Sequence, residues 1–425
     1  MKARLTDRWI YIIAVINSLL LISIWGVEYA GDSYSYLKSW DDSWSKGIMD
    51  EFRTPIYPVF LGILKIVFGK HFDIICIILQ HCIFIYSIKY FKRILSLKVR
   101  SQKVIWWLTL AYVLLPSTSS WANLLLTETF AIVGIVFLFY NIFQFHQNAK
   151  LINVCWSVFW FAFLIFLRPA SLYLFPTILF AWLLFFKQHK RMATLGFIGI
   201  CIVGLFEIEY CEKFKERYGI FAPSSVSTIN YSWIAFQEGL MDPSFTNDTT
   251  YASFIKKYNG RKIPAQKVVK HFGVITVHNS ITASQRSLPI KWISTSFMRF
   301  YYASSTWFLA AYSGYGPLTH LFGVSICTLN LFLLIYIILL VWKMKKCHNL
   351  YRASLIMWIT CVGNLILVVI GAPEEWGRLL IPSLPLIIIM FGQALNYMKF
   401  NFRKFLTYSV SWVGRDRTPP RCIGK

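Results

Sequence analysis

Charged residues are scarce in this 425-residue chain: 15% are Asp, Glu, Lys or Arg, whereas 56% are hydrophobic. Soluble domains carry about 25% charged residues, so the composition excludes an ordinary soluble domain. In place of charge, the chain has recurrent apolar runs of about 18 residues or more, each long enough to cross a bilayer as a helix. We therefore expect an all-α polytopic membrane protein, because lipid offers no partner to unpaired backbone groups.

Several signatures of other protein classes are also missing. The nine cysteines are an odd number, include no Cys-x-x-Cys pair and lie mostly inside apolar runs, which argues against a disulfide framework. The eight histidines show no His-Glu-x-x-His spacing, so no metal ligand is assigned, although a divalent ion as cofactor stays open. No glycine-rich loop that would hold a nucleotide phosphate is visible, and no internal repeat is evident.

The apolar runs predict about ten transmembrane helices. We place them at 9–28, 73–91, 104–120, 126–145, 151–167, 170–186, 192–210, 318–342, 353–371 and 379–397. The first run is interpreted as a retained anchor rather than a signal peptide, because it has no small-residue cleavage site. The segment 56–69 has about 14 residues, too few to span, and is predicted to be a short helix at the outer interface.

The distribution of positive charge orients these helices. With the N-terminus inside, the inner segments hold 24 of the 43 lysines and arginines but only two of the 19 acids. Because lysine and arginine collect on the cytoplasmic side, we expect both termini in the cytoplasm of a bacterial cell, at the inner membrane. This topology and contact with anionic headgroups explain the net charge of +24 better than binding of nucleic acid does.

This orientation divides the chain into four parts. Residues 1–210 form an N-terminal membrane module whose first outer loop, 29–72, is acidic and is the expected catalytic loop. Residues 211–317 form an extracytoplasmic segment, polar at first and aromatic from about 291, where we expect an interfacial or re-entrant helix. Residues 318–397 form the last three membrane helices, and 398–425 are a basic cytoplasmic tail.

Five ionisable residues from distant regions all map to the outer ends of predicted helices. An ionisable residue at the rim of an apolar bundle is a functional candidate. Each also has a plain structural explanation: solvation of the aspartate, a favourable helix dipole for the glutamate, and a headgroup or a nearby Glu374 or Glu375 for an arginine. The five residues are Asp32, Arg53, Glu128, Arg168 and Arg378.

Together these residue types suit group transfer from a lipid-linked phosphate. A carboxylate can take the proton of an incoming hydroxyl. Arginines present a planar set of donors that suits phosphate, and they stabilise the charge that develops on it as it leaves. Tyr36 lies four residues after Asp32 and would share its face if this loop were helical.

The order of the motifs resembles the polyprenyl-phosphate-sugar-dependent glycosyltransferases of GT-C type. This group includes the protein O-mannosyltransferases of glycosyltransferase family 39 and the lipid A aminoarabinose transferases. The motifs that carry the resemblance are, in order, Asp-x-x-x-Tyr after the first helix, "RTPIYPVFLGILKIVFG", Thr-Glu opening a helix, Arg-Pro after a helix, and "GRLLIPSLP" near the end. The string that begins "RTPIYP" is the most specific of them.

The resemblance implies a GT-C fold and a role for each site residue. It implies that Asp32 is the catalytic base and that Glu128 is a second catalytic acid, at a position where the family more often has Asp. From the residue types we expect contacts with the lipid-phosphate sugar donor at Tyr36, Arg53, Tyr57, Arg168 and Arg378. The expected activity is transfer of a sugar from a polyprenyl phosphate to a glycan, lipid or protein acceptor, in one inverting displacement and without a general need for metal.

Other functions stay open from the sequence alone. A lipid-linked polysaccharide polymerase or ligase would share the outer loop and the arginines. A transporter or flippase would instead place ionisable residues near the middle of its helices. A non-catalytic scaffold would tolerate Asp32→Asn without effect. The sequence names neither the sugar, the acceptor, the length of the lipid carrier nor the oligomeric state.

Overall fold

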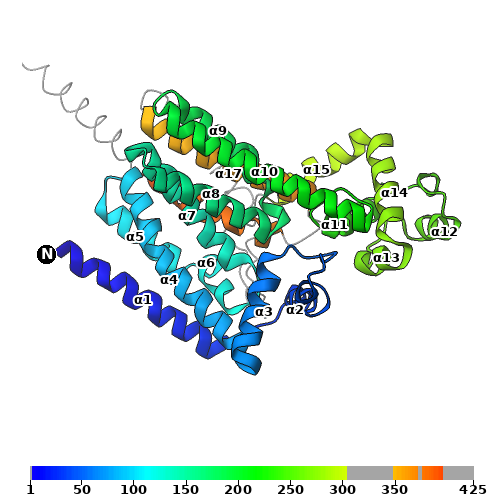
Figure 1. Cartoon of the computed structure of the whole chain (residues 1–425), viewed down its shortest axis with the longest axis horizontal. Helices are drawn as coiled ribbons and strands as arrows, with labels where there is room; N and C mark the ends of the chain where they lie inside the picture. Colours follow the sequence, from blue (N-terminus) through cyan, green and yellow to red (C-terminus); the bar gives the residue numbers. More distant parts are fainter. Residues whose placement is uncertain (1, 304–347, 372–375, 396–425) are drawn as a thin grey trace, which may run out of the picture.

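The computed structural model of the chain describes residues 2–303, 348–371 and 376–395. Over these ranges the chain is built from helices and short connections, and the extended pairing is limited to one isolated bridge between Glu28 and Leu124. The chain is an all-α polytopic membrane protein, as its composition predicts (Figure 1).

The helices follow one another with few long connections. In chain order they are α1 (Lys2–Trp25), α2 (Gly31–Asp42), α3 (Ile56–Phe68), α4 (Phe72–Lys98), α5 (Gln102–Leu114), α6 (Pro116–Ser119), α7 (Glu128–Asn148), α8 (Leu151–Leu167), α9 (Leu174–Phe186), α10 (Lys190–Tyr218), α11 (Val226–Gln237), α12 (Thr249–Tyr258), α13 (Ala265–Phe272), α14 (Val274–Ser287), α15 (Pro289–Ala303), α17 (His348–Gly371), α18 (Trp376–Leu380) and a helix over 384–395.

Seven helical stretches among the described residues are long and apolar enough to cross a membrane. They are Arg8–Trp25, Ile56–Lys98, Glu128–Asn148, Pro169–Phe186, Lys190–Tyr218, Tyr351–Gly371 and Arg378–Leu395. Leu151–Leu167 is apolar but shorter. Eight of the ten predicted spans therefore coincide with an apolar helix, and the one at 318–342 lies outside the described residues.

The predicted span at 104–120 is wrong as a continuous helix. Helix α5 ends at Leu114 after 13 residues, and α6 and a 3-10 helix (Ser120–Asn123) carry the chain on to the junction with Glu28, so the crossing is made in pieces. The break follows from Pro116, because a residue that precedes proline is pushed out of the α region. Leu115 accordingly has extended dihedrals, and Pro116 begins the separate short helix α6.

The membrane helices form one bundle centred on α7. This helix packs against α4 and α8, and α9 and α10 pack together on the other side of α8 (Figure 1). Most side chains of α7 are buried, including Val133, Val136 and Phe139. Since α7 is apolar nearly all round, it has to lie inside the bundle, and this places its first residue, Glu128, among the ends of its neighbours.

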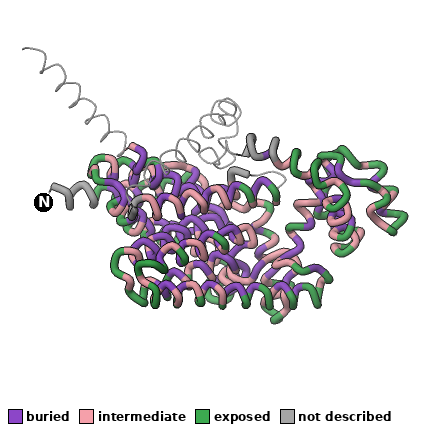
Figure 2. The backbone as a smooth tube through the Cα atoms, turned by 90° about the horizontal axis from the view of Figure 1, so that it is seen from above, coloured by how far each residue is buried: buried purple, intermediate pink, exposed green. Residues whose placement is uncertain are grey.

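Helices α11 to α14 form a small lobe set apart from the bundle (Figure 2). The long helix α10 leads to it and continues to Tyr218, beyond the predicted end of the span at 210. The lobe has an apolar core of its own, with Phe236, Tyr251 and Val277 fully buried. Its first residues bind the first outer loop, because Ser225 donates its backbone N–H and hydroxyl to the carbonyl of Glu51 at 2.9 and 3.0 Å.

Helix α3 is the short helix predicted at 56–69, and it packs against both α2 and α4. It ends at Gly69, whose φ of 54° lies in the region that favours glycine. The close approach of α2 depends on Gly62, because a Cβ at this position would lie 2.0 Å from the ring of Trp40. This contact fixes the position of α2, which carries Asp32.

Gly62→Ala is expected to destabilise the protein by about 1–3 kcal/mol, the usual effect of overpacking a tight contact. The measurement is the midpoint of thermal unfolding of the purified protein in detergent. Gly31→Ala is the control, since a Cβ at Gly31 would meet no atom within 4 Å. An equal loss in both variants would show that the contact with Trp40 is not the cause.

Candidate active site

A backbone bridge brings the first outer loop beside the start of α7. Glu28 donates its N–H to the carbonyl of Asn123 at 3.0 Å and accepts the N–H of Leu125 at 3.2 Å. The Asn123 side chain holds the same junction, because its amide donates to the carbonyls of Leu21 and Gly26 at 3.0 and 2.9 Å. These bonds set the ends of α1 and α7 next to one another.

Asp32 lies in the first turn of α2, immediately after this junction. The Ser33 hydroxyl accepts the N–H of Ala30 at 3.0 Å, and this bond defines where the helix begins. An acid in the first turn is favoured by the helix dipole. Because residues 31–42 are helical, Asp32 and Tyr36 share a face, as their spacing of four predicts.

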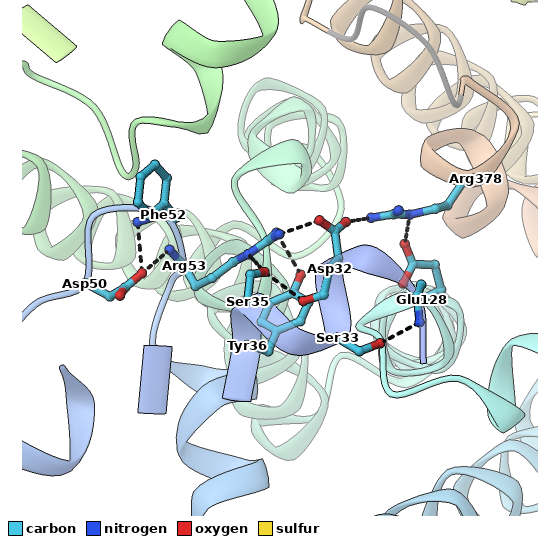
Figure 3. Close-up of polar contacts among 10 residues, drawn as sticks. Asp32, Ser33, Ser35, Tyr36, Asp50, Phe52, Arg53, Glu128 and Arg378 are labelled. Carbon is cyan, nitrogen blue, oxygen red and sulfur yellow. Dashed lines mark hydrogen bonds and ion pairs between the residues drawn. The ribbon is translucent and has the colours of Figure 1, made fainter. Parts of the chain in front are cut away.

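Arg53 approaches Asp32 from the loop that precedes α3. Asp50 shapes this loop, since its Oδ1 accepts the backbone N–H groups of Phe52 and Arg53, both at 2.8 Å. The Arg53 guanidinium lies over the Tyr36 ring, 4.4 Å from its centroid, and its Nε donates to the Ser35 hydroxyl at 2.7 Å. Helix α2 therefore supplies both a stacking surface and an acceptor for this arginine (Figure 3).

Asp32 is held between two arginines. One carboxylate oxygen accepts a hydrogen bond from Arg53 and the other accepts one from Arg378 (Figure 3). Arg378 also donates from Nε to Oε1 of Glu128 at 2.7 Å, and Nη1 of Arg168 lies 3.9 Å from the same oxygen. The five charged residues thus form one chain of alternating sign that runs from Arg53 to Arg168.

The two ends of this ion-pair chain differ in access to solvent. The Asp32 side chain is 30% exposed, and those of Arg53 and Arg378 are each 16% exposed. Glu128 is fully buried, and the Arg168 side chain is 7% exposed. A substrate can therefore reach the site at Asp32, whereas Glu128 and Arg168 lie behind Arg378.

The chain of ion pairs carries an excess of one positive charge, from three arginines and two carboxylates. Its buried end is also short of hydrogen bonds: Oε2 of Glu128 and Nη1 of Arg168 have no hydrogen-bond partner among the described residues. Buried polar atoms are normally paired, so such atoms call for an explanation. Because these atoms lie at the buried end, the positive charge that an anion can reach is that of Arg53 and Arg378.

The arginines set the ionisation of Asp32. Burial alone would raise its pKa, but the charges of Arg53 and Arg378 and their hydrogen bonds outweigh it and lower the pKa to about 2. Asp32 is therefore ionised at neutral pH and, while both arginines hold it, is a weak base.

The lowered pKa makes a pH-dependent contribution to stability with a defined sign. A carboxylate whose pKa falls on folding stabilises the protein above its unfolded value and loses that contribution as pH falls through the folded one. The difference in stability between the wild type and Asp32→Asn is expected to be constant above about pH 4 and to vanish between about pH 4 and 2. Thermal unfolding in detergent across this range measures it. A difference that changes instead between pH 5 and 8 would contradict the pairing with two arginines.

The structure brings together most of the residues that the sequence singles out. Asp32, Tyr36, Arg53, Glu128, Arg168 and Arg378 all lie in this cluster. Among the residues that the structure describes, Arg378 pairs with the carboxylates of Asp32 and Glu128, and the alternative partners Glu374 and Glu375 lie outside these residues. Metal ligands do not gather here: the part of the chain that the structure describes has no group of three or more His, Cys, Asp or Glu that could hold an ion.

Two of the predicted site residues are buried in the structure. Tyr57 is fully buried, its hydroxyl donates to Oε1 of Gln80 at 3.3 Å, and its ring supports that of Tyr36 from the core. Glu128 is equally buried, between Arg378 and Arg168, where it can position both arginines. Contact of Tyr57 with the donor and a role of Glu128 as second catalytic acid stay predictions.

Sequence reasoning missed two residues that build the site. Ser35 binds Arg53, and Asp50 shapes the loop that carries it. The Asp50-x-x-Arg53 spacing is a signal for Asp50, because an aspartate often accepts the backbone N–H groups two and three residues on. Ser35 gave no such signal, since its partner lies 18 residues away.

Comparisons with known proteins give one structural likeness to describe. Neither a protein-family model nor a curated protein matches the sequence. The chain is similar to the solved structure of an archaeal oligosaccharyltransferase, AglB from Archaeoglobus fulgidus, in complex with an inhibitory peptide and a dolichol-phosphate. The two are 10% identical with a TM-score of 0.49, over 97% of this chain and 53% of that one. The chain thus spans about half the length of that protein.

Proposed function

We propose that this chain is an integral membrane glycosyltransferase. It would transfer a sugar from a polyprenyl-phosphate carrier to an acceptor on the extracytoplasmic side of the inner membrane, with inversion at the anomeric carbon. The acceptor is a glycan, a lipid or a protein. The proposal rests on the ion-pair chain at Asp32 and on the motif order of the sequence.

The charge of the cluster is the observation that carries this proposal. A polyprenyl-phosphate sugar is a phosphodiester with one negative charge, and the five charged side chains have one positive charge in excess. Arginine binds phosphate through a planar fork, and Arg53 and Arg378 are the arginines that solvent reaches. We therefore expect the donor phosphate to bind at Arg53 and Arg378.

The transfer step needs a base, a leaving group and a cation. The acceptor hydroxyl gives its proton to the Asp32 carboxylate while its oxygen forms a bond to the anomeric carbon. The bond from that carbon to the phosphate oxygen breaks at the same time, and its electron pair leaves with polyprenyl phosphate. Arg378 and Arg53 stabilise the charge that develops on the departing phosphate.

Donor binding would also activate Asp32. With both arginines on it, the carboxylate has a pKa of about 2 and takes up a proton poorly. A phosphate that draws Arg378 or Arg53 toward itself removes a cation from Asp32, so the pKa of the carboxylate rises and its strength as a base increases. The donor would then have to bind before the acceptor is deprotonated.

The positions of the charges favour an enzyme over a transporter. Glu128 is the first residue of α7, Arg168 follows the last residue of α8, and Arg378 opens the final apolar stretch. A transport path would place such residues near the middle of the helices. A polymerase or ligase of lipid-linked polysaccharides stays the second candidate, because the same arginines would suit its diphosphate donors.

A transfer assay in proteoliposomes tests the proposal. The purified protein receives radiolabelled polyprenyl-monophosphate sugars and polyprenyl-diphosphate sugars, with a cell-envelope extract as acceptor, and the released lipid phosphate is followed. Release from the monophosphate donors alone is the expected result. Release from the diphosphate donors alone would support the polymerase or ligase, and no release from folded protein would contradict both. A parallel series with EDTA shows whether a divalent ion takes part.

A further inference from the structure

The stretch of chain from α12 to α15, which includes most of the small lobe, has bases but no acid. Residues 249–303 contain nine lysines and arginines and not one aspartate or glutamate. In the proposed topology this stretch lies on the extracytoplasmic side of the membrane. The enrichment of lysine and arginine that orients membrane proteins concerns cytoplasmic loops, so it does not apply to this stretch. Membrane topology therefore does not explain this charge.

Five of these bases gather on two neighbouring helices and their connection. Lys256 and Lys257 end α12, Arg261 lies in the connection, and Lys267 and Lys270 lie on α13, all five exposed. The two helices are held together by aromatic contacts between them, such as that of Phe254 with Phe272, with centroids 5.3 Å apart. We call these five residues the basic face.

The basic face has no carboxylate to neutralise it. None of its five residues forms an ion pair within the part of the chain that the structure describes. The lysines of α10 behave differently, because Lys213 pairs with Glu209 at 2.8 Å and Lys215 lies 3.7 Å from Glu212. Five exposed bases within residues 256–270, with no ion-pair partner among the described residues, produce a local positive potential that concentrates anions.

The arrangement of the lobe favours a partner that lies away from the membrane. Helix α10 leads from the bundle to the lobe, and α12 lies at the end of the lobe away from the bundle, with α13 beside it (Figure 1). The lobe also binds the loop that carries Arg53, since Tyr218 and Ser225 bond to the carbonyls of Met49 and Glu51.

We propose that the basic face binds a polyanionic polymer, a glycan that carries repeated phosphate or carboxylate groups. This inference rests on the proposed function. The polymer is the acceptor, and the lobe holds the polymer while one of the polymer's hydroxyl groups reaches Asp32. Binding through exposed lysines is mainly electrostatic and long-ranged, so it raises the local concentration of the acceptor more than it selects a sequence of sugars.

Binding of fluorescein-labelled inorganic polyphosphate tests the proposal without any sugar transfer. The full chain is placed in phosphatidylcholine proteoliposomes with the lobe outward, an orientation checked by protease access, so the basic cytoplasmic segments are enclosed. The quadruple variant K256Q/K257Q/K267Q/K270Q is expected to bind at least about tenfold more weakly than wild type at low salt. Binding by wild type should also weaken steeply as salt rises, because salt screens exposed charges.

The matched control is K213Q/K215Q, which removes two exposed lysines that already have carboxylate partners. It should bind polyphosphate within about twofold of wild type, since paired charges add little to the local potential.

Equal affinity of the quadruple variant and wild type would overturn the proposal. So would binding to phosphatidylglycerol vesicles without binding to polyphosphate, because the partner would then be a lipid surface. As the readout is binding, failure of the proposed transferase activity leaves this result unaffected.

Discussion

Asp32→Asn is expected to lower sugar transfer by about 10²- to 10⁴-fold, the usual contribution of a general base. Asparagine keeps the shape of the side chain and an acceptor oxygen for Arg53 or Arg378, but it cannot take the proton of the acceptor hydroxyl. The turnover number should therefore fall much more than the affinity for the donor. Initial rates of polyprenyl phosphate release in proteoliposomes, at varied donor concentration, separate the two effects.

Asp41→Asn is the control for this experiment. Asp41 lies on the same helix, is about half exposed and pairs with Lys65 at 2.7 Å. Because an exposed ion pair contributes little, transfer by this variant should match wild type. Full activity of Asp32→Asn would remove Asp32 from the mechanism and would favour the non-catalytic scaffold.

Glu128→Ala is expected to cause the largest loss of stability, about 3–5 kcal/mol. Glu128 is fully buried and binds Arg378 at 2.7 Å, with Arg168 at 3.9 Å. Its removal leaves Arg168 without its carboxylate in a site closed to water, and a buried charge without a partner is costly. The measurement is thermal unfolding in detergent.

Glu128→Gln separates the effect of losing the negative charge from the effect of losing the volume of the side chain. Glutamine fills the same space and still accepts a hydrogen bond from Arg378, so this variant should fold even where Ala does not. It should transfer sugar more slowly than wild type, because Arg378 is less well positioned, and its pH profile should keep the shape set by Asp32. Glu209→Gln, at an exposed pair on α10, is the control and should leave stability unchanged. If Glu128→Gln instead abolishes transfer as fully as Asp32→Asn does, the buried glutamate is more than a positioning residue.

Much of the fold was predictable because the helices of a membrane protein depend on local composition. A run of apolar residues becomes a helix in lipid whatever its neighbours are, so eight predicted spans coincide with apolar helices. The short helix at 56–69 was predictable for the same reason, since its prolines, its length and its glycine end are all local. The prediction of one continuous helix over 104–120 was wrong because it followed hydropathy and gave no weight to Pro116, the residue at which the helix breaks.

The candidate site was predictable in its members but not in its pairings. Ionisable residues at the ends of apolar runs are few, so Asp32, Glu128 and the three arginines stood out. Which carboxylate each arginine binds depends on how the helix ends are arranged: Arg378 binds Glu128 across 250 residues and Asp32 across 346. The burial of Tyr57 was not predictable, because no local pattern shows that α3 turns this side chain toward α4.

The sequence by itself determined the class of protein, most of its membrane helices and the charged residues of the site, because each depends on composition within one segment. Only the tertiary structure decided that Asp32 lies partly exposed between two arginines while Glu128 lies buried behind one. It also decided that the lysines of α12 and α13 lie exposed and form no ion pair among the residues that the structure describes. Access to solvent and the sum of nearby charges arise between segments, so they depend on packing rather than on any single stretch of the chain.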